Sequence, residues 1–208
     1  MSLQGLDYFS KQSTGKLNEF RANGISFICR YYCPIGYSSK LLTKEEVQEI
    51  SNAGMDVVPV YETDSTYVSY FTYDQGYEDC LEAISRAEAI GQPYDSAIYF
   101  AVDCDMRNNL DKVYEYFHGV SDAMMKYYHY KGAKWYTGIY AGYDVVKYMH
   151  NKWGITHIWQ TKAWSEGRVY LGNNIYQYEV DTSLNPVYFC GVRVDKNSST
   201  GSTGGFRI

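Results

Sequence analysis

Two carboxylates follow one apolar segment of the chain and could carry out acid–base chemistry. Residues 97–102 read Ala-Ile-Tyr-Phe-Ala-Val, and Asp103 and Asp105 come next, separated by Cys104. Because side chains two residues apart in an extended chain share a face, we expect both acids to project together where a buried strand meets solvent. Like charges in a partly desolvated site raise one pKa, which leaves a proton donor beside an ionised partner. A solvated turn closed by an Asx hydrogen bond is the structural alternative.

Polar residues also stand near the ends of other apolar segments. They are Asp7, Arg30, Glu62, Tyr140, Gln160, Gln177 and Asp195. Carboxylates and amides bind the hydroxyl groups of sugars, and aromatic faces bind their C–H surfaces. The chain has 24 tyrosines, Tyr61 among them, more than a core of this size can hide with every hydroxyl satisfied. Brought together, these residues would suit a polyhydroxylated ligand, although clustered carboxylates also bind Mg²⁺ or Ca²⁺.

The spacing of apolar residues predicts alternating strands and helices. Strands are expected at 5–9, 25–32, 56–62, 97–102, 135–141, 155–160, 174–179 and 191–195. Five predicted helices separate the first six strands, and each ends at a glycine just before the next strand. This succession of βα units indicates an α/β fold with a parallel sheet, and eight strands fit a closed (β/α)8 barrel of the TIM type. We expect the last two units to be irregular, because no helical pattern separates their strands.

The barrel prediction gathers the polar residues in one ring, because the active site of a parallel barrel lies at the carboxyl ends of its strands. An open, doubly wound sheet is the rival architecture. The turn after the first strand carries no glycine-rich phosphate loop, so nucleotide binding loses its main support. Pro59 falls within the third predicted strand and indicates a bulge or a widened ladder there, since proline has no N–H to donate.

Composition and charge exclude several classes of partner. A chain of 208 residues with 45% hydrophobic content predicts one domain, residues 1–197, followed by a flexible Ser/Thr/Gly-rich tail, residues 198–208. The formal net charge is −5 and lysines and arginines form no cluster, so we expect no nucleic-acid partner. No apolar run is long enough to span a membrane, and residues 1–15 lack the pattern of a signal peptide. We expect a monomer.

The cysteines and histidines do not point to a metal or a cofactor. The five cysteines lack metal-ligand spacing, and the four histidines fall on predicted helices or at a strand start, away from the predicted rim. We therefore expect neither a metal nor a cofactor. Cys104 would be a poor nucleophile, because the acids on either side raise the pKa of its thiol.

Six short segments carry a resemblance through their order and spacing. They are Gly5-Leu-Asp7, Arg30, Ala101-Val-Asp-Cys-Asp105, Gly138-Ile-Tyr-Ala-Gly142, Trp159-Gln160 and Val194-Asp-Lys-Asn197. Over residues 4–197 the chain resembles the glycoside-hydrolase-like TIM-barrel domain of unknown function, a distant relative of the family 25 glycoside hydrolases, which are lysozymes.

The resemblance implies carboxylate catalysis on peptidoglycan. In the lysozyme family an Asp on the first strand and an Asp-x-Glu on the fourth cleave the β-1,4 bond between N-acetylmuramic acid and N-acetylglucosamine. By resemblance Asp7, Asp103 and Asp105 occupy those places. Asp105 stands where the family has its proton-donating Glu and is one methylene shorter. Either the substrate sits closer, or Glu62 serves as the acid, or the barrel binds without cleaving.

We therefore expect a glycoside hydrolase that acts on a cell-wall polysaccharide such as a peptidoglycan fragment, in an extracellular or cell-wall location. A non-catalytic carbohydrate-binding barrel and a metal-dependent hydrolase are the alternatives. The expected catalytic residues are Asp7, Glu62, Asp103 and Asp105. The expected substrate-binding residues are Arg30, Tyr61, Tyr140, Gln160, Gln177 and Asp195.

Overall fold

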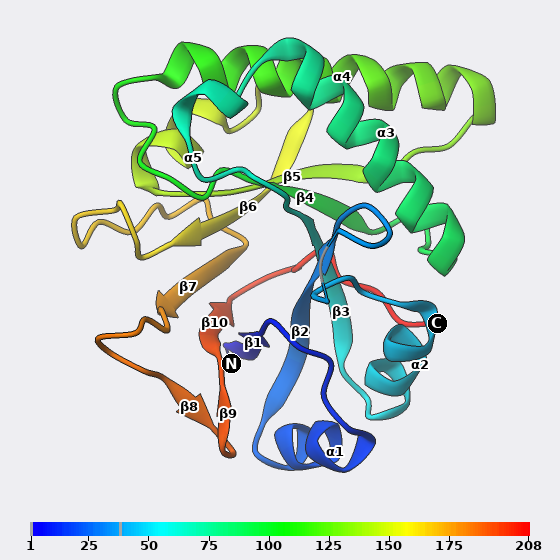
Figure 1. The fold of residues 1–208 in the computed structure, drawn as a ribbon, viewed down its shortest axis with the longest axis vertical. Coiled ribbons are helices and arrows are strands. Elements are labelled where there is room, and N and C mark those ends of the chain that lie inside the picture. The colour runs from blue at the N-terminus through cyan, green and yellow to red at the C-terminus, as the bar shows by residue number, and fades with distance from the viewer. Residues whose placement is uncertain (1, 38) are drawn as a thin grey trace.

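Eight strands close a barrel in the computed structural model, which describes residues 2–37 and 39–208 (Figure 1). The barrel strands are β1 (Leu3–Asp7), β2 (Ile25–Tyr32), β3 (Asp56–Tyr61), β4 (Ala97–Ala101), β5 (Tyr136–Ala141), β6 (Ile155–Thr161), β7 (Ile175–Glu179) and β10 (Asp195–Ser199). Around the barrel they pair in the order β1, β10, β7, β6, β5, β4, β3, β2. The predicted α/β barrel of the TIM type is confirmed.

Five α-helices follow the first five strands and lie outside the barrel. Hydroxyl groups of Ser13, Thr43 and Thr72 cap the first three, and Gly91 and Gly132 end the third and fourth in the left-handed conformation. None of the helices in the described residues is long and apolar enough to cross a membrane. The helices are α1 (Thr14–Ala22), α2 (Lys44–Asn52), α3 (Tyr73–Ile90), α4 (Leu110–Lys131) and α5 (Tyr143–Met149), and a short 3-10 helix η1 (Val68–Tyr70) precedes α3.

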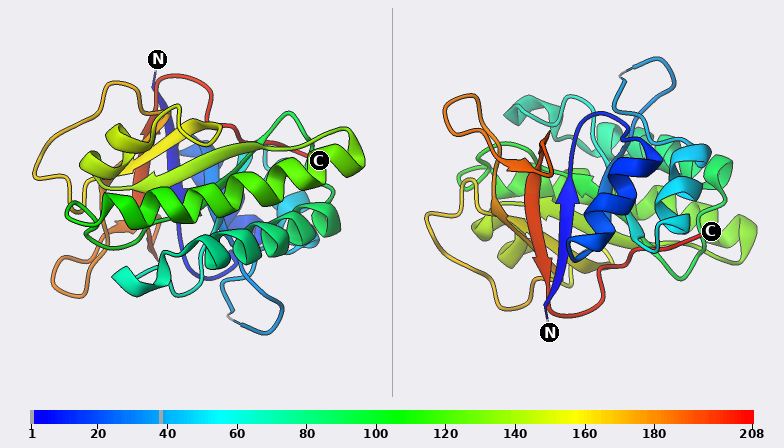
Figure 2. Two further views of the ribbon diagram at one scale, coloured as in Figure 1. Left: turned by 90° about the horizontal axis from the view of Figure 1, so that it is seen from above. Right: turned by 90° about the horizontal axis from the view of Figure 1, so that it is seen from below.

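Helices α3 and α4 lie side by side along one flank of the barrel (Figure 2). They approach closely because a glycine stands in each helix at the contact. A Cβ atom at Gly119 would lie 2.0 Å from the carbonyl oxygen of Tyr73, and one at Gly76 would lie 1.9 Å from that of Tyr116. Only glycine allows this backbone separation.

The last two units are irregular, as predicted. No helix stands between β7 and β10; a hairpin of β8 (Tyr188–Phe189) and β9 (Val192–Arg193) lies there instead. Strand β10 runs antiparallel to both of its neighbours. An antiparallel strand begins at the rim where its parallel neighbours end, so Asp195, the first residue of β10, pairs with Asp7, the last residue of β1.

The side chains of each strand alternate between the inside of the barrel and the helices outside. On β4, Tyr99 and Ala101 belong to the inner cluster, whereas Ile98 and Phe100 pack with the helices. Asp103 continues the inward series just beyond the strand. The inner cluster consists of Phe27, Cys29, Val58, Val60, Ala97, Tyr99, Ala101, Tyr140, Trp159 and Ile175.

The end of the chain differs from the flexible tail expected at residues 198–208. Val57 and Phe206 exchange two backbone hydrogen bonds, of 2.8 and 3.0 Å, and the N–H of Ala97 donates to Gly204 at 2.8 Å. The segment thus pairs with the N-terminal parts of β3 and β4. The two strands pair with each other only further along, at Val60 and Tyr61 of β3. Backbone pairing and burial of Phe206 therefore override a composition typical of a linker.

Candidate active site

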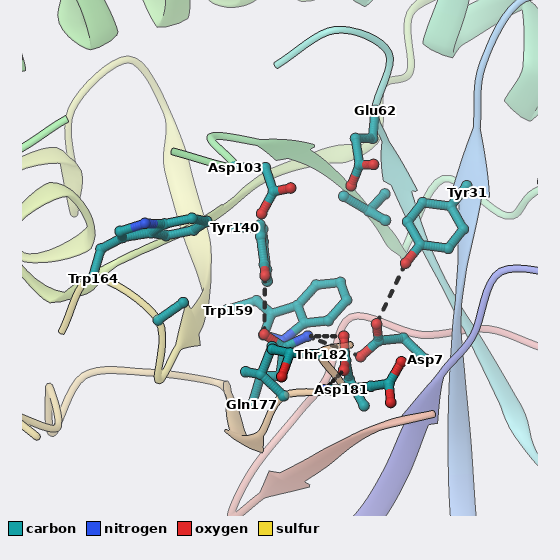
Figure 3. Close-up of a pocket in the computed structure, with 14 residues that line it drawn as sticks. Asp7, Tyr31, Glu62, Asp103, Tyr140, Trp159, Trp164, Gln177, Asp181 and Thr182 are labelled. Carbon is teal, nitrogen blue, oxygen red and sulfur yellow. Dashed lines mark hydrogen bonds between the residues drawn. The ribbon is translucent and has the colours of Figure 1, made fainter. Parts of the chain in front are cut away.

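A cavity of about 380 Å³ opens at the rim where the parallel strands end (Figure 3). Six of the ten predicted site residues line it: Asp7, Glu62, Asp103, Tyr140, Gln177 and Asp195. The other lining residues are Tyr31, Val60, Trp159, Ala163, Trp164, Val180, Asp181 and Thr182. The lining residues come from strands all around the barrel and from the loops that follow them, so only the closed barrel brings them together.

Asp7 and Asp195 form a carboxyl pair at the floor of the cavity. Asp7 Oδ2 accepts hydrogen bonds from Asn197 Nδ2 at 2.6 Å and Gln177 Nε2 at 3.1 Å. The same Gln177 nitrogen lies 3.1 Å from Asp195 Oδ2. Burial raises the pKa of both acids, and the charge of Asp7 helps to raise the pKa of Asp195 to about 9. A pKa of about 9 keeps Asp195 protonated at neutral pH, whereas the hydrogen bonds that Asp7 Oδ2 accepts from Asn197 and Gln177 favour the ionised form of Asp7 against its burial.

The Asp103 carboxyl is partly protonated at neutral pH. It follows β4, where its N–H donates to the carbonyl of Ser65 at 2.9 Å. Burial, reinforced by the negative charge of Glu62, raises the pKa of the Asp103 carboxyl to about 7, although Lys40 opposes this shift. Within the described residues no hydrogen bond engages this carboxyl, which lines the cavity.

Glu62 lies next to Asp103 at the rim (Figure 3). It follows β3, and its Oε1 atom lies 2.6 Å from the ammonium group of Lys40. This ion pair is largely buried and holds the Glu62 side chain in place. Glu62 therefore contributes a fixed negative charge beside the Asp103 carboxyl.

Aromatic rings form much of the cavity wall. Tyr31 and Trp164 lie on opposite sides of the cavity, and Trp159 lies between them in this view (Figure 3). Hydrogen bonds hold the inner rings: Trp159 Nε1 donates to Asn197 at 2.8 Å, and the Tyr140 hydroxyl donates to Gln177 at 2.9 Å. Rigid rings beside carboxyl and amide groups are the surfaces that sugars bind.

Four predicted site residues lie elsewhere. Arg30, Tyr61 and Gln160 each occupy an outward position of their strand, one residue away from a position that faces the barrel. Arg30 is fully buried between β2 and α2, where its guanidinium pairs with Glu46 at 2.6 Å. Tyr61 packs against Phe100 outside the barrel, with 6.2 Å between the ring centres.

Gln160 and Asp105 are the other two. Gln160 is buried and donates to Ser165 at 3.1 Å. Asp105 lies on the loop after β4, is exposed, and binds Arg107 through both carboxylate oxygens at 2.9 and 2.6 Å. These hydrogen bonds hold the pKa of Asp105 below its usual range. Asp105 does not join Asp103 in the cavity, because β4 ends at Ala101 and the strand alternation stops.

The structure adds polar residues that were not predicted as site residues. Asp181 and Thr182 lie on the loop after β7, and Asn197 is buried on β10. The loop residues carry no periodic signal that could have revealed them. Asn197 is two residues beyond Asp195, so strand alternation from Asp195 would have placed it inside the barrel. No group of three or more His, Cys, Asp or Glu residues in the described chain is arranged to hold a metal ion.

Comparison with solved structures supports the fold. The Tat-secreted protein Rv2525c of Mycobacterium tuberculosis, solved with L-tartrate, is 19% identical with a TM-score of 0.74, and the match covers 98% of both chains. The autolysin LytC of Streptococcus pneumoniae, solved with a synthetic peptidoglycan ligand, is 14% identical with a TM-score of 0.63 over 95% of this chain and 46% of LytC. A family 25 glycosyl hydrolase of Bacillus anthracis is 16% identical with a TM-score of 0.56 over 96% and 89% of the chains.

Curated relatives are longer proteins. YbfG of Bacillus subtilis is 35% identical over 133 residues, which is 60% of this chain and 18% of YbfG. A match to FadG of the same organism spans 26% of that protein. The sequence profile of the Rv2525c-like, glycoside hydrolase-like domain matches residues 18–199, nearly the whole barrel. The chain therefore belongs to the Rv2525c-like family of glycoside hydrolase-like domains, whose fold is related to that of family 25 lysozymes.

Proposed function

We propose that this barrel hydrolyses glycosidic bonds of a cell-wall polysaccharide, with peptidoglycan as the substrate. The observation that carries the proposal is Asp103, a carboxyl group with a pKa of about 7 that faces the cavity beside the carboxylates of Asp7 and Glu62. Glycoside hydrolysis needs a protonated acid and an ionised carboxylate on either side of the scissile bond. We assign Asp103 as the acid and Asp7 as the carboxylate.

Each carboxyl group takes a role from its surroundings. Asp103 protonates the oxygen of the leaving sugar. Asp7, whose ionised form is favoured by the hydrogen bonds from Asn197 and Gln177, stabilises the positive charge that develops on the sugar ring, or acts there as base or nucleophile. Glu62 maintains the raised pKa of Asp103 through its charge. Asp195 stays protonated next to Asp7. Because both carboxyl groups bind the same Gln177 nitrogen, Asp195 helps to keep Asp7 oriented.

Two of the related proteins favour this substrate and its location. LytC was solved with a peptidoglycan ligand, and Rv2525c is secreted. We extend both to this chain as proposals: a peptidoglycan fragment as ligand, and action outside the cell or at its wall. The roles of Tyr140 and Gln177 in binding the sugar, and a monomeric state, are proposals of the same kind.

A non-catalytic carbohydrate-binding barrel is the second candidate. The observation that favours it is Asp105, which stands where the lysozyme family has its acid and yet lies outside the cavity with Arg107. In that case the cavity would bind saccharide without cleaving it. Asp103 would then donate no proton to a leaving group.

Release of reducing ends from purified peptidoglycan tests the proposal. We expect hydrolysis whose rate falls above an apparent pKa of about 7, because Asp103 must be protonated to act as acid. The pH–rate profile of kcat/KM is the measurement. Saccharide binding without any release of reducing ends, at acidic and at neutral pH alike, would identify the binding barrel instead.

A further inference from the structure

The loop between β6 and β7, residues 162–174, carries Trp164 into the cavity wall on an unfavourable backbone. Trp164 and Glu166 have φ of 53° and 51°, a region that side-chain-bearing residues rarely adopt. A Cβ atom at Gly142 would lie 3.1 Å from the Cβ of Trp164, so the loop also packs closely on the turn after β5. Such a conformation persists only where the surrounding contacts determine it.

One set of contacts anchors the loop from the barrel side. Ser165 is fully buried, and its hydroxyl donates to the carbonyl of Thr161 at 2.5 Å. The same oxygen accepts hydrogen bonds from Gln160 Nε2 at 3.1 Å and from the N–H of Tyr143 at 3.0 Å. This anchor fixes the residue between Trp164 and Glu166 but leaves their side chains to other contacts.

The second set crosses the rim. Arg107 binds Asp105 through Nη2 at 2.6 Å and through Nε at 2.9 Å, and its Nη1 atom binds Glu166. The other oxygen of Glu166 lies 3.4 Å from Arg168, which pairs with Asp144 of α5 at 2.5 Å. We call Asp105, Arg107 and Glu166 the rim strap. It ties the loop after β4, which also carries Asp103, to the loop that carries Trp164.

We infer that the rim strap positions Trp164 as the aromatic wall against which a sugar ring packs. This inference rests on the proposed function and makes Asp105 a positioning residue that acts through Arg107 and Glu166. A wall that contacts the sugar equally in the ground state and the transition state lowers KM without changing kcat. The strap therefore sets affinity for saccharide, whereas Asp103 sets the rate of cleavage.

Glu166→Gln tests the inference, since it removes both ion pairs of Glu166 and keeps its size. We expect KM for peptidoglycan fragments to rise roughly three- to tenfold, with kcat changed less than about twofold. Because the strap residues are partly exposed, about 1 M NaCl should raise KM of the wild type by a similar factor and leave the variant unchanged. Glu82→Gln is the matched control: it removes the pair with Arg86 on α3, at 2.9 Å, and should not alter KM.

A double-mutant cycle shows whether the strap acts through Trp164. Saccharide affinity is measured by titration in the Asp103→Asn background, so that cleavage does not interfere. Glu166→Gln should weaken binding in that background but have no further effect once Trp164 is replaced by Ala. If the losses of affinity caused by Glu166→Gln and Trp164→Ala multiply in the double variant, the inference is overturned. Unchanged affinity in Glu166→Gln would overturn it as well.

The outcome for the strap can be separated from the outcome for the proposed function. A wild type that binds saccharide without cleaving it sinks the hydrolase proposal, and the same titrations still decide the strap. If the wild type binds no saccharide, tryptophan fluorescence becomes the readout. The emission of Trp164 is obtained as the difference between the spectra of the wild type and of Trp164→Phe. It should change with salt in the wild type and not in Glu166→Gln; an emission indifferent to salt overturns the strap.

Discussion

Replacing Asp103 by Asn is expected to lower kcat on peptidoglycan by a factor of about 10² to 10⁴, the usual contribution of a general acid. Asn keeps the size of the side chain and cannot give up a proton. The leaving phenol of an aryl glycoside needs little protonation. On such a substrate the loss in kcat caused by Asp103→Asn should therefore be at least about tenfold smaller than on peptidoglycan. Kinetics of the variant on both substrates check this expectation.

The same substitution should stabilise the fold. Because burial raises the pKa of Asp103 to about 7, the folded state keeps a proton that the unfolded state releases above about pH 4. Folding stability attributable to Asp103 is therefore complete below about pH 4 and is lost as pH rises toward 7. Asp103→Asn removes this loss, so we expect a gain of up to about 4 kcal/mol at about pH 8 that disappears near pH 4. Urea unfolding at both pH values measures it.

Asp95→Asn is the matched control for Asp103→Asn. Asp95 precedes the same strand at the opposite end of the barrel and is exposed. The substitution Asp95→Asn should change neither kcat nor the pH dependence of folding stability. Full activity of Asp103→Asn on peptidoglycan would remove Asp103 from the role of acid, whatever its effect on stability.

Asp7→Asn is expected to give the second large loss, a fall in kcat of about 10² to 10³, because the carboxylate that we propose to stabilise the developing charge becomes neutral. The fold should tolerate the change. The amide oxygen of Asn can accept the hydrogen bonds that Asn197 and Gln177 now donate to Asp7 Oδ2. Affinity for saccharide in a titration should therefore stay within a few fold of the wild type.

Asp195→Asn separates charge from geometry at the same pair. Asp195 is already neutral at pH 7, since burial and the neighbouring Asp7 raise its pKa to about 9. A neutral amide in its place preserves the charge of the pair, so the loss in kcat should be at least about tenfold smaller than for Asp7→Asn. Equal losses in the two variants would mean that the pair acts through its geometry alone.

The order of elements could be predicted from the sequence because it depends on local signals. Runs of apolar residues, and a glycine between each helix and the strand that follows it, mark each βα unit through β6; α5 itself ends at Met149, before Gly154. Which face of a strand points inward could not be predicted in the same way. Strands of a parallel barrel are buried on both faces, so β2 shows no alternation that would separate Cys29, inside, from Arg30, outside.

The partial success at the site has the same origin. Asp7, Asp103 and Gln177 were predicted to lie at the rim because they stand near strand ends, and all three line the cavity. Strand alternation puts Asp105 beside Asp103 only if the strand continues past Ala101, where β4 ends. Trp164 lies in the wall through a loop whose left-handed residues no sequence pattern marks.

A crystal structure of Asp103→Asn with a peptidoglycan fragment that the wild type cleaves would test the catalytic role of this cavity most directly. We predict a sugar ring between Tyr31 and Trp164, with its glycosidic oxygen within hydrogen-bonding distance of the side chain at 103 and the ring facing Asp7. A saccharide bound only elsewhere on the barrel, or a glycosidic oxygen far from residue 103 with Asp7 out of reach, would contradict that role.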